Sequence, residues 1–310
     1  MQARINARKF EYLINISSNL GPSSAEGKRL LERFIPECLK LYKHTLCLNK
    51  SLEGQPLLVT DNQPGDDACL LAVVGLVHLA RLDDGLASRA QKVIYLLQAG
   101  CLLDHLLSRS KHNYQALLIL VRLYHRLGAG SLALTIWPRL DVKQIQHDTL
   151  SYNLLTRIST THPHAVRISP YDGVDKTSLD PGRYLMKALD VYPRFDVQIQ
   201  EQSHSALQHG SYDQIQGFVE LGERLRSSVS KYLWGLELRR IGRLLRNSTW
   251  ASQPLLDFTA TSRLVDNRDH MVFLSCDAAD APPLEYLLET GPVPKVCMQK
   301  LPSMTNGRRK

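Results

Sequence analysis

The residues Gly128–Ala133 have the types and spacing of a dinucleotide-binding loop, since GAGSLA fits the pattern Gly-x-Gly-x-x-Ala. Such a loop follows a β-strand, so that the pyrophosphate meets the N-terminus of the next helix. Here the preceding residues place Arg122, His125 and Arg126 at helical spacing opposite an apolar face. No acidic residue follows at a strand end about 20 residues on, where a ribose would need one. We therefore interpret the stretch as a turn between two helices and expect no cofactor site.

Two pairs of polar residues could also do chemistry. His162 and His164 flank a proline, but two histidines without carboxylate or thiol partners make a poor metal site, so we expect solvated loop histidines. His147 and Asp148 lie in the polar run 144–149, which could be catalytic in principle and more simply begins a helix. The chain has no HExxH, GxSxG, GxxxxGK[ST] or paired CxxC motif. We predict no catalytic residue, no metal ligand and no enzyme activity of its own.

A basic stretch runs from Gly222 to Arg246, with seven basic residues against two acidic ones. Arg239, Arg243 and Arg246 stand at i, i+4 and i+7, so one helix face would carry three guanidinium groups, with Arg240 beside them. Like charges at this spacing repel each other, and an acidic partner would relieve the repulsion. A solvated face on a basic protein explains the pattern equally well. The packed side of the same helix is predicted to consist of Val229, Leu233, Leu236 and Leu244.

The elements that would position these residues are helices. With Tyr114 as the first position, the stretch 111–158 matches a tetratricopeptide-like helix–turn–helix unit. Gly128 suits the left-handed position that ends a helix, and the small Ala133 lets the second helix lie close, with Trp137 filling the gap. Val121 stands where the consensus is small and Ile145 where a proline is usual, so an ordinary antiparallel helix pair remains the alternative. The predicted packing residues of the unit are Leu117, Leu120, Tyr124, Gly128, Ala133 and Trp137.

Similar patterns continue along the chain, and no alternating strand pattern persists. We predict an all-α, tetratricopeptide-like α-α superhelix over residues 1–250, with an exposed loop at 162–181 and an irregular C-terminal extension over 251–310. Around Gly210 the residues Ala206, Ile215 and Val219 repeat the spacing around Gly128. Further helices are predicted over 1–20, 24–48, 66–82, 86–109, 144–161, 182–190, 195–209, 211–225 and 228–247. Inward-facing residues of the helix 86–109 are predicted to be Val93, Leu96, Leu97, Leu103 and Leu107.

Composition limits the class of protein and its surroundings. The 310 residues carry a formal net charge of +8, a mild bias toward acidic partners, including RNA-rich surfaces. Six widely spaced cysteines, most among apolar neighbours, indicate a reducing compartment. The N-terminus lacks the apolar core of a secretory signal, although its weakly amphipathic basic character leaves a mitochondrial presequence as the alternative. The most apolar run, 68–80, is too short for a bilayer, which takes about 20 residues. We expect a cytosolic protein without membrane contact.

Three runs carry a family resemblance: QPGDDACLLA (63–72), LDVKQIQHDTLSYNLLTR (140–157) and ALQHGSYDQIQGFVELGERLRSSVSKYLWGLELRRIGRLL (206–245). Over residues 25–250 the chain resembles the non-catalytic subunit of the N-terminal acetyltransferase B complex, NatB, also described as the actin-cytoskeleton or mitochondrial-distribution proteins of fungi. Its most specific part is the run containing IQHDT, which generic tetratricopeptide repeats lack.

The resemblance implies a superhelix that wraps a separate catalytic subunit of the GNAT fold. It also implies a position near the ribosome, where nascent chains beginning Met-Asp, Met-Glu, Met-Asn or Met-Gln are acetylated. Acetyl-CoA and the catalytic groups would belong to the partner, so this chain would bind no cofactor and no small-molecule substrate. Because the family's chains are several times longer, we expect this sequence to correspond to an internal portion with an atypical tail after Trp250. The alternative is a generic helical-repeat adaptor that binds peptides or RNA–protein surfaces.

Overall fold

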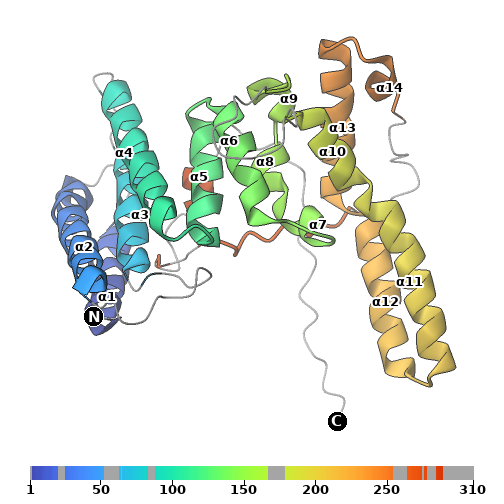
Figure 1. Ribbon diagram of the computed structural model, residues 1–310, viewed down its shortest axis with the longest axis horizontal. Helices are drawn as coiled ribbons and strands as arrows, with labels where there is room; N and C mark the ends of the chain where they lie inside the picture. Colours follow the sequence, from blue (N-terminus) through green and yellow to red (C-terminus); the bar gives the residue numbers. More distant parts are fainter. Residues whose placement is uncertain are drawn as a thin grey trace.

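The computed structural model describes residues 2–19, 25–51, 63, 65–82, 88–166, 179–253, 264–273, 276–277 and 284–288. Over these ranges the secondary structure is helical apart from two isolated β-bridges, Val166 with Leu179 and Ser228 with Val265. The helices up to Ala251 follow one another broadly in chain order along the molecule, whereas the last one, Leu284–Leu287, packs back against the helix Asp66–Leu82 (Figure 1). The predicted all-α superhelix is confirmed.

Most helices of the first half of the array are long, and the second half mixes short and long ones. A π-helical stretch, Tyr12–Ile16, and a 3-10 turn, Ser17–Asn19, follow the first helix. The elements of the N-terminal half are α1 (Gln2–Glu11), α2 (Ala25–Ser51), α3 (Asp66–Leu82), α4 (Ser88–Arg109), α5 (Tyr114–Arg126) and α6 (Gly130–Ile136). Those after them are a 3-10 turn (Trp137–Leu140), α7 (Gln146–Leu150), α8 (Tyr152–Leu155), α9 (Ile158–Thr161), α10 (Pro181–Leu189), α11 (Val191–Gln208), α12 (Tyr212–Arg226), α13 (Val229–Leu244), α14 (Ser248–Ala251) and α15 (Leu284–Leu287).

Helix α3 is the centre of the N-terminal half. Every residue from Ala68 to Ala80 is buried, because α2 and α4 cover opposite sides of a helix that is apolar all round. Gly75 allows the close approach of α2, since a Cβ there would lie 2.8 Å from Cγ1 of Ile35. The side chain of Asp66 accepts a hydrogen bond from Nδ2 of Asn113 at 3.1 Å, and Asn113 in turn caps α5. The starts of α3 and α5 are therefore held together.

Two predictions about these elements are wrong. On α4, Leu96, Leu103 and Leu107 are buried, but Val93 and Leu97 are 46% and 51% exposed because they lie on the face turned away from the core. The predicted helix over 144–161 is divided into α7, α8 and α9. The carbonyl of Asp148 accepts a hydrogen bond from the hydroxyl of Ser230 at 3.0 Å instead of continuing the helix, and Arg157 adopts a left-handed φ of 59°.

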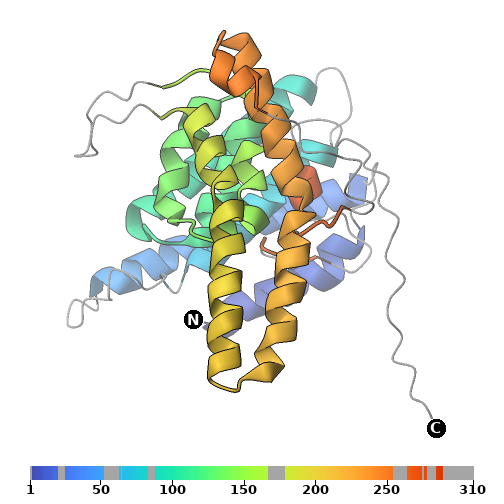
Figure 2. The same ribbon diagram turned by 90° about the vertical axis from the view of Figure 1, so that its right-hand side faces the viewer.

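Helices α11 and α12 form a long hairpin that projects from the rest of the array (Figure 2). Its turn is made by Gly210, whose φ of 73° nearly equals the 74° of Gly128 after α5. A residue with a side chain adopts this left-handed conformation at a cost, so both glycines suit helix-ending turns. Ala206 is buried, but Val219, predicted to correspond to Trp137, is 50% exposed because it lies on this projecting hairpin.

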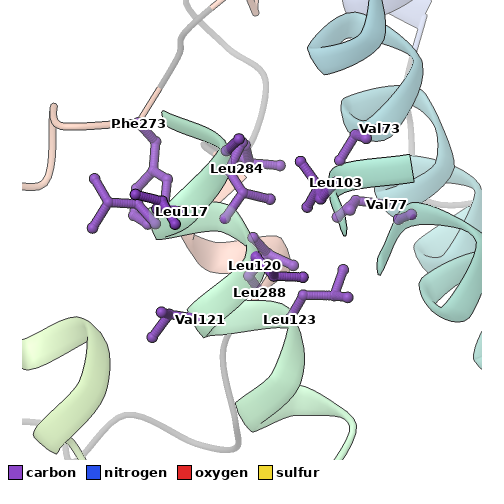
Figure 3. Packing of buried hydrophobic residues seen from close by; sticks show 14 of the residues in the cluster. Val73, Val77, Leu103, Leu117, Leu120, Val121, Leu123, Phe273, Leu284 and Leu288 are labelled. Carbon is purple, nitrogen blue, oxygen red and sulfur yellow. The ribbon is translucent and has the colours of Figure 1, made fainter. Parts of the chain in front are cut away.

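The chain after α14 returns along the array toward its N-terminal half. Residues Leu264–Phe273 contain no helix. Phe273 at the end of this segment is buried, as are Leu284, Leu287 and Leu288. Figure 3 shows Phe273, Leu284 and Leu288 beside Leu117 and Leu120 of α5. The described parts of the C-terminal extension therefore add to the core.

The loop predicted at 162–181 lies partly outside the described residues, which also leave out residues 52–62, residue 64 and the chain from 289. At the two ends of this loop, Val166 and Leu179 exchange backbone hydrogen bonds of 2.8 and 3.1 Å, and Pro181 already begins α10. No helix in the described part of the chain combines the length and apolar character needed to cross a bilayer.

The cysteine side chains differ in solvent exposure. Cys38 and Cys69 are buried, and burial raises the pKa of each to about 12, so both are unreactive thiols. Cys47 and Cys101 are exposed, against the expectation that most thiols are buried. Cys297 lies outside the described residues.

Candidate protein-interaction surface

The central helix pair fixes the middle of the array. Leu117, Leu120, Ala133 and Trp137 are each at most 3% exposed, and the turn that begins with Trp137 packs against both α5 and α6. The half-buried Tyr124 donates its hydroxyl hydrogen to Oδ2 of Asp104 on α4 at 2.9 Å. These contacts connect α4, α5 and α6 into one packed unit.

In the turn Gly128–Ala133, whose sequence resembles a nucleotide-binding loop, one glycine forms the turn and the other allows close packing of two chain segments. The turn follows helix α5 rather than a strand, and Gly128 has the left-handed φ described above. A Cβ on Gly130 would lie 2.6 Å from Cβ of His162, so this glycine lets α6 lie against the residue that follows α9. The stretch is therefore a turn between two helices, as predicted.

The two loop histidines differ in exposure. His164 is exposed, but His162 is half-buried against Gly130, so the prediction of a solvated side chain is wrong for it. Burial, followed by the nearby His164, lowers the pKa of His162. Within the described ranges no three His, Cys, Asp or Glu side chains are grouped as metal ligands would be.

The family-specific run IQHDT contributes a buried polar network. Asp148 is 1% exposed, and its Oδ1 accepts hydrogen bonds from the hydroxyl of Tyr192 at 2.6 Å and from the hydroxyl of Ser228. Burial and the adjacent Asp148 carboxylate raise the pKa of Tyr192 well above its ordinary value, which keeps the phenol protonated as a donor. Asp148 thereby connects α7 with α11 and with the start of α13. The prediction that Asp148 lies at a helix start is confirmed, and its role is to hold helices together.

Two other histidines are buried near the centre. Burial lowers the pKa of His125 to about 4, with smaller contributions from Arg122 and His162. Burial also lowers the pKa of His147 to about 4, assisted by Lys187, and Nδ1 of His147 lies 3.1 Å from the hydroxyl of Ser151. Both imidazoles are neutral at physiological pH, which is typical of packed histidines.

The basic residues near the end of α13 form a smaller surface than predicted. Arg243 and Arg240 are exposed and Arg239 is half-buried. Arg246 is also exposed, but α13 ends at Leu244 and Arg246 has a φ of 54°, so the expectation that it continues the helix face is wrong. We name Arg239, Arg240, Arg243 and Arg246 the arginine surface.

The packed side of α13 also differs from the prediction. Val229 is buried, but Leu244 is 61% exposed, and the buried face consists instead of Trp234, Leu238 and Ile241. Glu237 lies on this same face, 5% exposed, where it accepts hydrogen bonds from the backbone N–H of Ser159 at 2.9 Å and from Arg240 at 2.7 Å. Glu237 is one of the two acidic residues counted against the seven basic ones in this stretch. The i, i+4, i+7 spacing of Trp234, Leu238 and Ile241 could have revealed its buried position.

Trp250 holds α14 against two helices through two glycines. A Cβ on Gly182 of α10 would lie 2.3 Å from the Trp250 ring, and one on Gly242 of α13 would lie 2.4 Å from the backbone nitrogen of Ala251. The glycines therefore allow α10, α13 and α14 to pack closely. This packing fixes the end of α13 that carries the arginine surface.

Comparison with known proteins agrees with this architecture. The family described as the N-acetyltransferase B complex (NatB) non-catalytic subunit matches residues 1–270. The N-terminal acetyltransferase B complex subunit arm1 of Schizosaccharomyces pombe is 30% identical over 262 residues, which cover 84% of this chain and 29% of that protein. The human N-alpha-acetyltransferase 25, NatB auxiliary subunit, is 28% identical over 278 residues, covering 86% of this chain and 26% of the human protein.

A solved structure described as the NatB acetyltransferase complex bound to CoA and MES contains a chain with the same fold. Its TM-score is 0.56 at 19% identity, and the match covers 93% of this chain and 35% of that one. The present chain thus spans about a quarter to a third of the length of the relatives that it matches. On the strength of the match over residues 1–270, the chain belongs to the family of NatB non-catalytic subunits.

Proposed function

We propose that this chain acts as a scaffold that binds a separate GNAT-type catalytic subunit and supports N-terminal acetylation by it. The observation that carries the proposal is the family match over residues 1–270, and the shared superhelical fold supports it. A stacked array of helices presents an extended surface on which another protein can be held in one orientation. The polar ties of Asp148 and Glu237 between distant helices make that surface rigid.

Acetyl-CoA is proposed to bind to the catalytic partner and not to this chain. Acyl carriers with phosphate groups are commonly held by backbone N–H groups at the start of a helix after a glycine-rich turn. The turn at Gly128–Ala133 has residue types suited to binding phosphate, but Gly128 forms the turn that ends α5 and Gly130 packs against His162. The chain is accordingly proposed to take no cofactor and no small-molecule substrate.

The finer parts of the proposal concern place and substrate. The complex would work in the cytoplasm close to the ribosome and acetylate nascent chains that begin Met-Asp, Met-Glu, Met-Asn or Met-Gln, with effects on actin organisation following from that activity. The arginine surface supports a position near the ribosome, because exposed guanidinium groups attract phosphates. The net charge of +8 acts in the same direction.

Co-expression with the catalytic subunit of the same organism tests the function. The purified pair is expected to acetylate peptides beginning Met-Asp, Met-Glu, Met-Asn and Met-Gln, with peptides beginning Ser or Ala as controls. The chain alone is expected to acetylate none. Equal rates for the catalytic subunit with and without this chain would contradict the proposal.

A helical-repeat adaptor for peptides or RNA–protein surfaces is the second candidate, and the basic charge of the chain favours it. Affinity capture from a lysate of the same organism distinguishes the two. Recovery of a GNAT-type subunit supports the scaffold. Recovery of ribonucleoprotein without such a subunit supports the adaptor.

A further inference from the structure

Residues Leu264–Val272, which we name the strap, cross the array without forming a helix of their own. The strap begins beside the junction of α12 and α13, passes α7 and α8, and ends beside α5. Figure 1 shows this course as the orange segment that runs back from the region of α13 toward α5. An extended segment therefore lies along a face built from helices far apart in the sequence.

Most of the hydrogen bonds between the face and the strap involve main-chain atoms of the strap. The N–H of Val265 donates to the carbonyl of Ser227 and the carbonyl of Val265 accepts from the N–H of Val229, both at 2.9 Å. Four residues on, the N–H of Asp269 donates to the carbonyl of Thr149 at 3.0 Å. Side chains add further hydrogen bonds: Tyr152 donates to the carbonyl of Asp269 at 3.0 Å and Gln115 donates to the carbonyl of Val272 at 2.8 Å. Nε of Arg224 on α12 donates to Oδ1 of Asn267 at 3.3 Å, and Nδ2 of Asn267 donates to the carbonyl of Arg224 at 3.1 Å.

Main-chain hydrogen bonds of this kind recognise an extended peptide of almost any sequence, and pockets for individual side chains add the specificity. Tyr152 supplies one such contact, since the guanidinium carbon of Arg268 lies 5.8 Å from its ring centroid. The Arg268 side chain is pre-positioned by Asp266, whose carboxylate accepts two hydrogen bonds from it at 2.8 and 2.7 Å. The face therefore has the features of a site for an extended peptide that carries an arginine.

The strap and the residues after it are held in different ways. Asp269, His270 and Met271 are exposed, with Met271 83% exposed, whereas the other six residues of the strap are partly buried and Val272 packs against the core. The hydrogen bonds that hold the strap are replaced by bonds to water on release, so each contributes only modestly to binding. After the strap, Phe273 is buried, and the carboxylate of Asp277 accepts a hydrogen bond from the hydroxyl of Tyr12 at 2.7 Å. The strap is thus a partly exposed segment attached to a buried anchor.

We infer that the face formed by Ser227, Val229, Thr149, Tyr152 and Gln115 is a peptide-binding surface that the chain's own strap occupies in cis. An extended segment of a partner, with an arginine placed to stack on Tyr152, binds there when the strap leaves. The buried anchor keeps the strap near the face at a high effective concentration, so the competing peptide must displace a tethered ligand. This inference does not depend on the proposed acetyltransferase role, because it rests on contacts within the chain.

The test weakens the strap without changing the face. In the full chain, Val265→Pro together with Asp269→Pro removes two donated N–H groups of the strap and leaves the binding face unaltered. The probe is a fluorescein-labelled peptide with the sequence of residues 264–272, followed by fluorescence anisotropy. The double variant is expected to bind the peptide at least about tenfold more tightly than the wild-type chain, because the tethered competitor is weakened. The Met271→Ala chain, altered only at an exposed side chain, is expected to bind like wild type.

A second peptide carrying the same two prolines is the matched control and is expected not to bind the double variant. Equal affinity of the natural peptide for wild type and double variant, or no binding to either, would overturn the inference. Loss of helical circular dichroism in the double variant would also overturn it, because a strap that cannot leave the folded array is part of the core.

Hydrogen exchange on the unmodified wild-type chain gives an independent measurement. The amides of Val265 and Asp269 are expected to exchange much faster than those of α3 and α5, because the strap opens while the array stays folded. Exchange of all these amides at one common rate would contradict a releasable strap.

Discussion

The hydroxyl of Tyr192 and the carboxylate of Asp148 form a 2.6 Å hydrogen bond between residues that are 44 positions apart. Both side chains are buried, at 3% and 1% exposure. Oδ2 of Asp148 has no hydrogen-bond partner among the described residues, so Oδ1 carries the whole stabilisation of the carboxylate. The short helices around the IQHDT run therefore depend on a contact with α11 to keep their place.

Tyr192→Phe removes the donor and keeps the ring, so it leaves a buried carboxylate that is poorly satisfied. The free energy of unfolding is expected to fall by about 1–3 kcal/mol. Chemical denaturation followed by circular dichroism measures the change. Tyr212→Phe serves as the control, because that side chain is 67% exposed and its change is expected to stay within about 0.5 kcal/mol. Equal effects of the two substitutions would show that the bond is unimportant.

Trp137→Ala removes a side chain that is 3% exposed at the turn packed on α5 and α6. Such truncations typically cost about 3–5 kcal/mol, through lost transfer energy and the cavity left behind. In a stacked array the loss is felt mainly by adjacent elements, so the thermal transition is expected to shift down and to broaden. The control is Leu132→Ala on α6, where the side chain is 47% exposed. An unchanged thermal midpoint for Trp137→Ala would show that this packing is wrong.

A structural feature can be predicted from the sequence when it depends on residues that lie close together in the chain. The turn at Gly128 and the apolar helix through Ala68–Ala80 follow from the spacing of nearby residues, and both are found. The break between α7 and α8 could not be predicted in this way, because it involves Ser230, which lies 82 positions from Asp148. Likewise, nothing near Gly130 in the sequence indicates that His162 will pack on it.

The candidate surface shows the same limit. The arginines of α13 can be identified in the sequence. The face of α13 that is buried, however, depends on the helices that pack against it. Trp250 packs against Gly182 of α10 and Gly242 of α13, and these three residues come together only in the folded chain. The strap cannot be predicted from periodicity, since most of its hydrogen bonds to the array involve its main-chain atoms.

His125 predicts a loss of stability in mild acid. Its pKa is lowered from 6.5 to about 4, chiefly by burial, so the unfolded chain binds a proton more readily than the folded chain between those values. The free energy of unfolding therefore falls as pH decreases through this window, by roughly 2 kcal/mol from this residue between pH 7 and pH 5. The lowered pKa of His147 acts in the same direction.

Urea denaturation of the wild type, His125→Gln and His112→Gln at pH 7 and pH 5 measures this effect. The exposed His112 is the control, and its variant is expected to keep the full pH dependence. His125→Gln is expected to be less stable at pH 7 and to lose less stability on acidification. A wild-type stability that is the same at both pH values would contradict the assignment.

The arginine surface predicts a salt-dependent association. Changing Arg239, Arg243 and Arg246 to Glu is expected to weaken co-sedimentation with ribosomes and capture of the catalytic subunit, because phosphate or carboxylate contacts are replaced by repulsion. Wild-type binding to ribosomes should fall steeply as salt is raised, since each neutralised phosphate releases a counterion. Helical content is expected to stay the same, because the buried face of Trp234 and Leu238 is untouched.

The matched control for this variant changes Arg4, Arg29 and Arg89 to Glu, since all three are exposed and the net charge changes equally. It is expected to bind more tightly than the first variant at every salt concentration. If the two triple variants and the wild type are retained equally, the arginine surface is only solvated.

The central claim is that this chain holds a catalytic subunit, and the direct measurement is the mass of the particle that the two proteins form. Size-exclusion chromatography with multi-angle light scattering is applied to the co-expressed pair and to each protein alone. The account predicts one peak whose mass is the sum of 35.0 kDa and that of one catalytic subunit, stable on dilution and on re-chromatography. Two separate peaks at the masses of the individual proteins, from samples whose circular dichroism shows both to be folded, would contradict it.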